Sequence, residues 1–210
     1  MVKKFVLFDF DGVIANSFQV GFNVYKSVYP DLTIAEFREA FDGNIHDWKE
    51  AMAKRNAKKR EGVDSISEYS ARMKGAVHIV PGMREVIISL EKDYSLAVIS
   101  STLSHAISEF LAAHDLAGYF EWIMGSDVHW NKTQKIKMVF EKYGVTHDEC
   151  IFITDTLGDI REARGADVDS IAVTWGFQTP DTLREGKPFR LVEAPNEIPV
   201  AVSDYFAQTI

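Results

Sequence analysis

The chain has 210 residues, of which 46% are hydrophobic and 26% charged, so its composition is that of a globular protein. This length is sufficient for one sizeable α/β core and a small second unit. Its formal net charge of −8 provides no basic field for a phosphate backbone, which argues against a nucleic acid polymer as partner but leaves small phosphorylated molecules possible.

The first predicted element is a strand, the apolar run 4–8, which ends in two carboxylates one residue apart, Asp9 and Asp11. Ligands of open α/β sheets bind outside the carboxyl ends of such buried strands. Two acids repel each other there unless a cation neutralises them or they take part in chemistry. Taken alone, the pair also fits a plain turn in which Asp11 and Gly12 are ordinary turn residues.

The beginning of the chain, Met1-Val2-Lys3-Lys4, superficially resembles that of a signal peptide, because its lysines come before the apolar residues of the run. Asp9 and Asp11 interrupt that run before it reaches the length of a signal sequence. The single cysteine, Cys150, excludes an intramolecular disulfide, and no apolar stretch approaches the roughly 18 residues that span a bilayer. We therefore expect a cytoplasmic protein that does not contact membranes.

From residue 17 to residue 76 the apolar residues recur at helical spacing, which predicts an all-helical segment after the first strand. Thr33 followed by Glu36 predicts a capping box at the start of one helix. Breaks between helices are expected at Pro30-Asp31, Asp42-Gly43-Asn44 and Glu61-Gly62. The segment also carries a basic run that either attracts substrate or forms a solvated helix face: Lys54, Arg55, Lys58, Lys59 and Arg60.

Beyond this segment, short apolar runs alternate with helical patterns. The expected strands are 95–100, 122–124, 150–154, 170–174 and 190–192, and the expected helices are 83–92, 104–114, a lysine-bearing helix up to Gly144, 159–164 and a final helix in the tail. Strands that alternate with helices predict parallel βαβ units. We therefore expect an α/β fold: a Rossmann-like doubly wound parallel sheet core, 1–16 and 77–210, with a small all-helical cap, 17–76, inserted after the first strand.

Polar groups follow three of the predicted strands, and two lysines lie near the start of a helix. In chain order they are Asp9 and Asp11, then Ser100-Ser101-Thr102, then Lys132 and Lys135, then Asp155 and Asp159. With Val80-Pro81-Gly82 before a helix that leads into the second strand, this pattern resembles the haloacid dehalogenase-like hydrolase superfamily over about the whole chain. It is most similar to the phosphoglycolate phosphatase-like branch, which has a helical cap.

The sequence departs from the family pattern at two places. Thr154 precedes Asp155, where the family more often has glycine. No proline-rich tripeptide follows the lysine, so Lys132 and Lys135 are both candidates for the catalytic cation. We favour Lys132, because it lies at the start of its helix, whereas Lys135 lies a turn further on and could face solvent.

The resemblance implies a Mg²⁺-dependent phosphomonoesterase that acts on a small phosphorylated metabolite through an aspartyl-phosphate. Asp9 is then the nucleophile, and Asp11 is the general acid and base. Mg²⁺ prefers oxygen ligands, and it would be held by Asp9, the backbone carbonyl of Asp11 and Asp155, with Asp159 orienting the ligands.

The phosphoryl group would be bound by Ser100, Ser101 and nearby backbone N–H groups at a helix start, while Lys132 offsets charge on it. A sugar phosphomutase of the same superfamily and a non-catalytic binding module remain alternatives. A dehalogenase is disfavoured, since its chemistry needs no metal and would not require Asp11 and Asp155 together. The six histidines show no paired metal-ligand spacing.

Overall fold

The computed structural model describes residues 4–54 and 65–208. Six strands form one sheet in the order β5-β4-β1-β6-β7-β8, and every pairing in it is parallel. The strands are β1 (Phe5–Phe8), β4 (Ser95–Ile99), β5 (Phe120–Met124), β6 (Cys150–Thr154), β7 (Asp169–Val173) and β8 (Arg190–Val192). β1 is therefore a central strand, as its continuous burial requires.

The described helices fall into two groups along the chain. The first group follows β1 and comprises α1 (Phe18–Val28), α2 (Ile34–Glu39), α3 (Ile45–Lys54) and α4 (Ser65–Met73). The second group alternates with the strands and comprises α5 (Met83–Glu91), α6 (Ser104–Ala113), α7 (Lys132–Tyr143), α8 (Leu157–Arg164), α9 (Pro180–Glu185) and α10 (Ile198–Gln208). Three short 3₁₀ turns complete the described elements: Ala117–Tyr119, His147–Glu149 and Pro195–Glu197.

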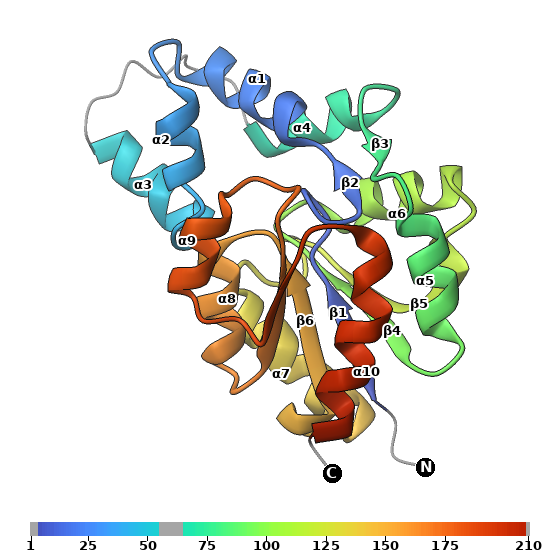
Figure 1. Ribbon diagram of the computed structural model, residues 1–210. Coiled ribbons are helices and arrows are strands. Elements are labelled where there is room, and N and C mark those ends of the chain that lie inside the picture. Colours follow the sequence, from blue (N-terminus) through green and yellow to red (C-terminus); the bar gives the residue numbers. More distant parts are fainter. Residues whose placement is uncertain (1–3, 55–64, 209–210) are drawn as a thin grey trace.

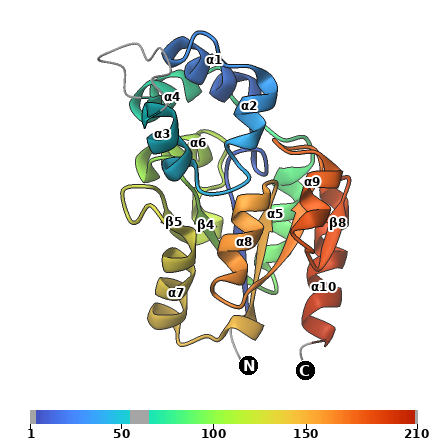
Figure 2. The same cartoon turned by 90° about the vertical axis from the view of Figure 1, so that its left-hand side faces the viewer.

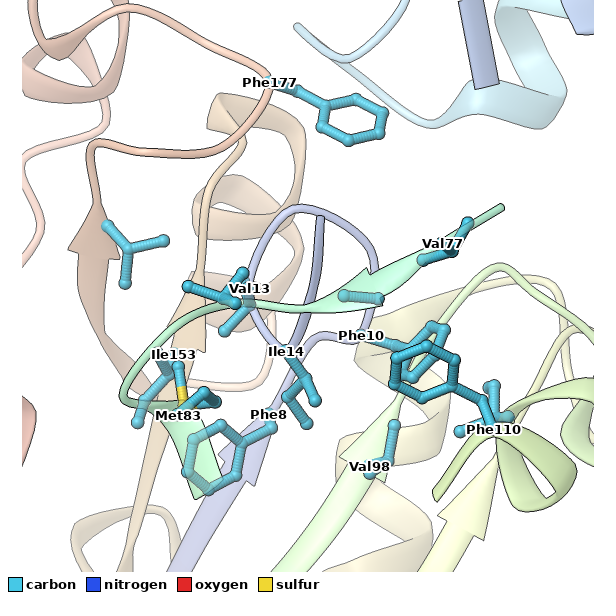
Figure 3. Packing of buried hydrophobic residues seen from close by; sticks show 14 of the residues in the cluster. Phe8, Phe10, Val13, Ile14, Val77, Met83, Val98, Phe110, Ile153 and Phe177 are labelled. Atoms are coloured by element: carbon cyan, nitrogen blue, oxygen red, sulfur yellow. The ribbon is translucent and has the colours of Figure 1, made fainter. Parts of the chain in front are cut away.

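Helices cover both faces of the sheet, because successive strand residues point to opposite sides. Val6 and Phe8 of β1 belong to an apolar cluster that includes buried residues of α5, α6 and α10. Phe5 and Leu7 belong to a second cluster with α7 and α8. Figure 3 shows part of the first cluster, with Phe177 at its upper edge. The predicted doubly wound α/β fold is confirmed.

The first group of helices lies together at one end of the sheet (Figures 1 and 2). The chain enters this group through β2 (Ala15–Asn16) and leaves it through β3 (His78–Ile79), which pair as an antiparallel ribbon. This ribbon lies at the two boundaries that the sequence suggests, at residues 16 and 77. The division into a core and a separate cap stays a prediction.

Most predicted elements match the described ones to within two or three residues. The capping box of Thr33 and Glu36 is confirmed, and the lysine-bearing helix ends at Gly144 in the left-handed conformation, with φ of 67°. Helix α9 and the strands β2 and β3 were not predicted. The break at Glu61-Gly62 and the basic run at 54–60 fall outside the described side chains, so both stay predictions. Within the described part of the chain, no helix is both long and apolar enough to cross a bilayer.

Candidate active site

The candidate site lies at the carboxyl ends of the central strands. β1 pairs with β4 on one side and with β6 on the other. Asp9 continues β1, and its backbone N–H donates a hydrogen bond of 2.9 Å to the carbonyl oxygen of Ile153 in β6. Because all these strands are parallel, the residues that follow them, Ser100 after β4 and Asp155 after β6, meet Asp9 and Asp11 at one edge of the sheet.

Lys132 joins two of the predicted acids. Its Nζ lies 2.8 Å from Oδ1 of Asp9 and 2.7 Å from Oδ2 of Asp159, and only 3% of the residue is exposed. Lys132 is the first residue of α7, where Asn131 caps the helix by accepting a hydrogen bond from the backbone N–H of Gln134. Burial would lower the pKa of Lys132, but the two carboxylates outweigh it and raise that pKa. The side chain is therefore a fixed cation beside Asp9.

Lys135 does not contact Asp9, and the suggestion that it could face solvent is wrong. Its side chain is fully buried, and Nζ donates to the carbonyl oxygens of Ser100 and, at 3.2 Å, of Gly125. One helical turn places it under the loop that follows β4 rather than on the outer face of α7. Burial, together with the ammonium of Lys132, lowers the pKa of Lys135 to about 7.

Asp159 is held in place by the residue at which the sequence departs from the family pattern. The hydroxyl of Thr154 donates a hydrogen bond of 2.8 Å to Oδ2 of Asp159, the oxygen that also contacts Lys132. Burial would raise the pKa of Asp159, but Lys132 and this hydrogen bond lower it. Burial raises the pKa of Asp9, against the opposing charge of Lys132. The lysine therefore stabilises a buried pair of acids that would otherwise repel each other.

Asp11 is held by two hydroxyl groups from distant parts of the chain. Thr102, in the loop after β4, donates a hydrogen bond of 2.6 Å to Oδ2, and the Tyr69 hydroxyl in α4 donates to Oδ1. Burial and the nearby Asp11 carboxylate raise the pKa of Tyr69, which keeps the phenol protonated. The orientation of the Asp11 side chain therefore depends both on the loop after β4 and on helix α4.

Asp155 is fully buried between two glycines. A Cβ atom on Gly12 would lie 2.0 Å from Oδ2 of Asp155, and one on Gly176 would lie 2.2 Å from the same oxygen. Gly12 also has φ of +76°, which glycine adopts without strain. Oδ2 accepts a hydrogen bond of 2.7 Å from the backbone N–H of Phe177. Burial raises the pKa of Asp155 to about 8.

The other oxygen of Asp155, Oδ1, is buried and has no hydrogen-bond partner among the described residues. A buried carboxylate oxygen without a partner is unfavourable unless a cation binds it. In the described ranges, no three His, Cys, Asp or Glu side chains stand together as a metal site. The predicted ligand set does not require three, because it combines Asp9 and Asp155 with a backbone carbonyl and water. The residues therefore fit a small oxygen-liganded cation.

Ser100 and Ser101 lie at the carboxyl end of β4, beside Asp9. Ser100 is almost fully buried, and its Oγ accepts a hydrogen bond of 3.0 Å from the backbone N–H of Thr102. This bond tightens the turn that leads into α6, which begins at Ser104. Both serines line the cleft described next, as their predicted role in phosphoryl binding requires.

A cleft opens above these residues. Its described lining comes from the loops at the sheet edge, from helices α3, α7 and α8, and from the loop between α2 and α3: Asp9, Asp11, Phe41, Gly43, Asn44, Ile45, Ser100, Ser101, Lys132, Thr156, Asp159, Glu162 and Phe177. Asp155 is absent from this lining, since it is buried beneath the cleft. The structure thus brings all the predicted site residues to one place, and their chemical roles stay predictions.

Several lining residues received no role from the sequence. Glu162 accepts hydrogen bonds from Nδ2 of Asn44, at 2.9 Å, and from the backbone N–H of Lys132, at 3.3 Å. It lies three residues after Asp159 in α8, so helical spacing alone places both on one face and could have revealed it. Phe177, which also lines the cleft, and Tyr69, which contacts Asp11, have no such signal, because nothing local connects them to the strand ends.

The sequence is similar to a known protein family and to characterised proteins over most of its length. A family model described as haloacid dehalogenase-like hydrolase matches residues 6–173. A phosphoglycolate phosphatase from Synechococcus elongatus is 21% identical over 97% of this chain and 99% of its own length. The pyrophosphatase PpaX from Listeria monocytogenes serotype 4b is 25% identical over 95% of this chain and 96% of its own length.

Solved structures share the fold. A predicted phosphatase from Clostridium acetobutylicum superimposes with a TM-score of 0.78 at 21% identity, covering 97% of this chain and 100% of that one. A predicted phosphoglycolate phosphatase from Haemophilus somnus gives a TM-score of 0.75 at 17% identity, covering 96% and 99%. The family resemblance seen in the sequence is confirmed.

Proposed function

The chain belongs to the haloacid dehalogenase-like hydrolase family, and we propose that it is a Mg²⁺-dependent phosphomonoesterase that hydrolyses a small phosphorylated metabolite. One observation carries the proposal: the buried ammonium of Lys132, 2.8 Å from Asp9 at the carboxyl end of β1. A phosphate monoester repels nucleophiles by its own charge, so a site must neutralise that charge and present an oxygen nucleophile. Asp9 and Lys132 together supply both.

In the first step, a carboxylate oxygen of Asp9 attacks phosphorus, and the bond between phosphorus and the ester oxygen breaks. Asp11, in its protonated form, gives its proton to the departing oxygen, and the alcohol leaves. The product on the protein is an aspartyl-phosphate at Asp9. The hydroxyls of Thr102 and Tyr69 can turn to donate or accept, so they can hold Asp11 in either protonation state.

In the second step, water attacks the phosphorus of the aspartyl-phosphate. Asp11, now a carboxylate, takes the proton of that water. The bond between phosphorus and Asp9 breaks, which releases inorganic phosphate and restores the carboxylate. Ser100, Ser101 and Lys132 would bind the phosphoryl oxygens through both steps.

We propose that Mg²⁺ is held by Asp9, the backbone carbonyl of Asp11 and Asp155, and that Asp159 acts indirectly, through Lys132. The buried, unpartnered Oδ1 of Asp155 supports this assignment. When bound, the ion would neutralise charge on the transferring phosphoryl group. A cation here would also offset the effect of burial on Asp9 and keep that carboxylate ionised.

The direct test is phosphate release from p-nitrophenyl phosphate and from a panel of metabolites, with Mg²⁺ and with excess EDTA. Phosphoglycolate and pyrophosphate belong in the panel because two relatives of this chain are named phosphoglycolate phosphatase and pyrophosphatase. We expect release that requires Mg²⁺. Full activity in EDTA would contradict the metal assignment, and isomerisation of a sugar phosphate without phosphate release would identify a phosphomutase instead.

Comparing Lys132→Met with Lys135→Met tests the assignment of the lysine. Lys132→Met is expected to lower kcat/KM by roughly 10²–10³-fold, because it removes a cation in contact with Asp9. Lys135→Met removes donors to two buried carbonyl oxygens, so we expect about 1–3 kcal/mol of lost stability and a smaller loss of rate. Steady-state kinetics and urea unfolding measure the two effects. Equal losses of rate in both variants would contradict the assignment.

A second prediction concerns the stability of the metal-free protein. The pKa of Asp155 is about 8 in the folded chain against an ordinary value of 3.8, so between these values the folded state binds more protons than the unfolded state. The free energy of unfolding should therefore fall as pH rises through that window, by up to about 1.4 kcal/mol per pH unit. Asp155→Asn should reduce this slope and stabilise the protein near pH 8.

Thermal unfolding in EDTA between pH 5 and pH 8 measures the slope, and addition of Mg²⁺ provides a second readout. Mg²⁺ should raise the unfolding temperature of the unaltered protein near pH 8 and have little effect on Asp155→Asn. If the variant kept both the slope and the response to Mg²⁺, Asp155 would not be a ligand.

A further inference from the structure

A second pocket opens beside the catalytic cleft and is lined mainly by residues of helices α1 to α4. The two cavities share five lining residues: Asp11, Phe41, Ile45, Ser101 and Phe177. Asp11 therefore stands where the two cavities meet. A general acid must lie within hydrogen-bond reach of the oxygen that it protonates. The ester oxygen, which joins the phosphoryl group to the leaving group of a bound substrate, must therefore lie near Asp11.

The wall of this second pocket is largely aromatic. Phe37 and Phe41 lie with ring centroids 5.2 Å apart, and Phe177 lies 4.9 Å from Phe41 and 6.0 Å from Phe37. Tyr25 continues the wall, 5.3 Å from Phe37. Phe37 is fully buried and Phe177 is 5% exposed, so these two rings hold Phe41, which is only partly buried, in a fixed position. Phe41 and the exposed edge of Phe177 offer an apolar surface to which another ring binds well.

Charge in this pocket is sparse. Of the described residues that line it, only Asp11 and Lys49 carry a charge, and they have opposite signs. The Nζ of Lys49 lies 5.3 Å from the centroid of the Tyr25 ring, against the aromatic wall. A small anionic leaving group would exchange water for apolar rings here, which is unfavourable. A neutral ring would bury apolar surface at no such cost.

We propose that the second pocket binds the leaving group of the substrate and that this group is a neutral alcohol bearing an apolar ring. The inference rests on the proposed phosphomonoesterase activity and narrows its substrate class. The phosphoryl group then lies beside Asp9 and Lys132, the ester oxygen lies at Asp11, and the ring lies against Phe41 and Phe177.

Two esters of matched reactivity test this preference: benzyl phosphate and ethyl phosphate, both esters of primary alcohols. We expect kcat/KM for benzyl phosphate to exceed that for ethyl phosphate about 100-fold, and to exceed the values for phosphoglycolate and pyrophosphate. Isothermal titration with benzylphosphonate and ethylphosphonate, which cannot be hydrolysed, should show the same order of affinity. Comparable or higher values for ethyl phosphate, phosphoglycolate or pyrophosphate would overturn the inference and leave the phosphatase activity intact.

Substitutions in the aromatic wall test whether the second pocket causes the preference for benzyl phosphate. Phe41→Ala should lower kcat/KM for benzyl phosphate at least about 10-fold more than it lowers kcat/KM for ethyl phosphate. Phe189→Ala is the matched control, a half-buried phenylalanine that does not line the pocket, and it should preserve the ratio of the two esters. An unchanged ratio in a folded Phe41→Ala protein would overturn the assignment of the pocket. Failure to hydrolyse any ester would overturn the proposed function itself, and the phosphonate titration would then show whether the ring still binds.

Discussion

Replacing Asp9 by Asn is expected to reduce phosphate ester hydrolysis by at least about 10⁴-fold while the protein stays folded. The amide cannot form the covalent bond to phosphorus that the proposed first step requires. Stability should be retained, because Asp9 is buried and the neutral amide avoids the charge that burial disfavours. Its carbonyl oxygen can still accept from Lys132 and from the backbone N–H of Phe10, which both contact Oδ1 in the native chain.

Two measurements check this expectation. Steady-state release of phosphate gives the loss of rate, and mass spectrometry of acid-quenched protein should detect a phosphorylated peptide containing residue 9 only in the unaltered chain. Asp167→Asn is a suitable control, since Asp167 is exposed and has φ of 59°, a conformation that Asn also tolerates. A phosphorylated peptide elsewhere in the chain, or normal turnover by Asp9→Asn, would assign the nucleophile to another residue.

Asp11→Asn should affect the two proposed steps differently, depending on the leaving group. An alkyl alkoxide needs a proton to leave, so hydrolysis of alkyl phosphates should fall by about 10²–10⁴-fold. The p-nitrophenolate ion leaves without a proton, so Asp9 should still become phosphorylated. Hydrolysis of the aspartyl-phosphate then lacks its base. The expected trace is a burst of nitrophenolate, up to one per site, followed by slow turnover.

Stopped-flow absorbance of nitrophenolate measures the burst. Tyr69→Phe is the matched control: it removes a hydroxyl that donates to Asp11 but keeps the carboxyl group, so no burst is expected. Steady turnover of an alkyl phosphate by Asp11→Asn at the native rate would show that Asp11 is not the proton carrier.

The sheet was predictable because each of its strands contains a short apolar run. The runs 150–154 and 190–192 coincide with β6 and β8, and the helix that starts at Lys132 ends at Gly144 as expected. The strands β2 and β3 have two residues each, too few for any periodicity to appear. Helix α9 is also short, although Thr179 before Pro180 is a start signal that could have been used.

The candidate site was predictable to the extent that it follows strand ends. Asp9, Ser100 and Asp155 directly follow central strands, and Asp11 comes two residues after Asp9, so parallel topology alone brings them together. The burial of Lys135 was not predictable, because it depends on the loop after β4, whose carbonyl oxygens accept its hydrogen bonds.

The contact of Tyr69 with Asp11 was equally unpredictable from the sequence, since 58 residues separate the two along the chain. Contacts of this kind depend on how the helical group sits against the sheet. Residue patterns within single elements carry no information about that arrangement.

The central position of β1 also has a consequence for the order in which the protein assembles. Phe5 pairs with Ser95 and with Cys150, so both neighbours of this strand are synthesised long after it. Pairings between such distant segments form slowly, because a long loop must close before any contact is gained. A nascent chain that ends before β6 leaves one side of an apolar strand unpaired and exposed to association with other chains. It also lacks Asp155 and Asp159, so the site is completed only when most of the chain has been synthesised and the sheet has closed around β1.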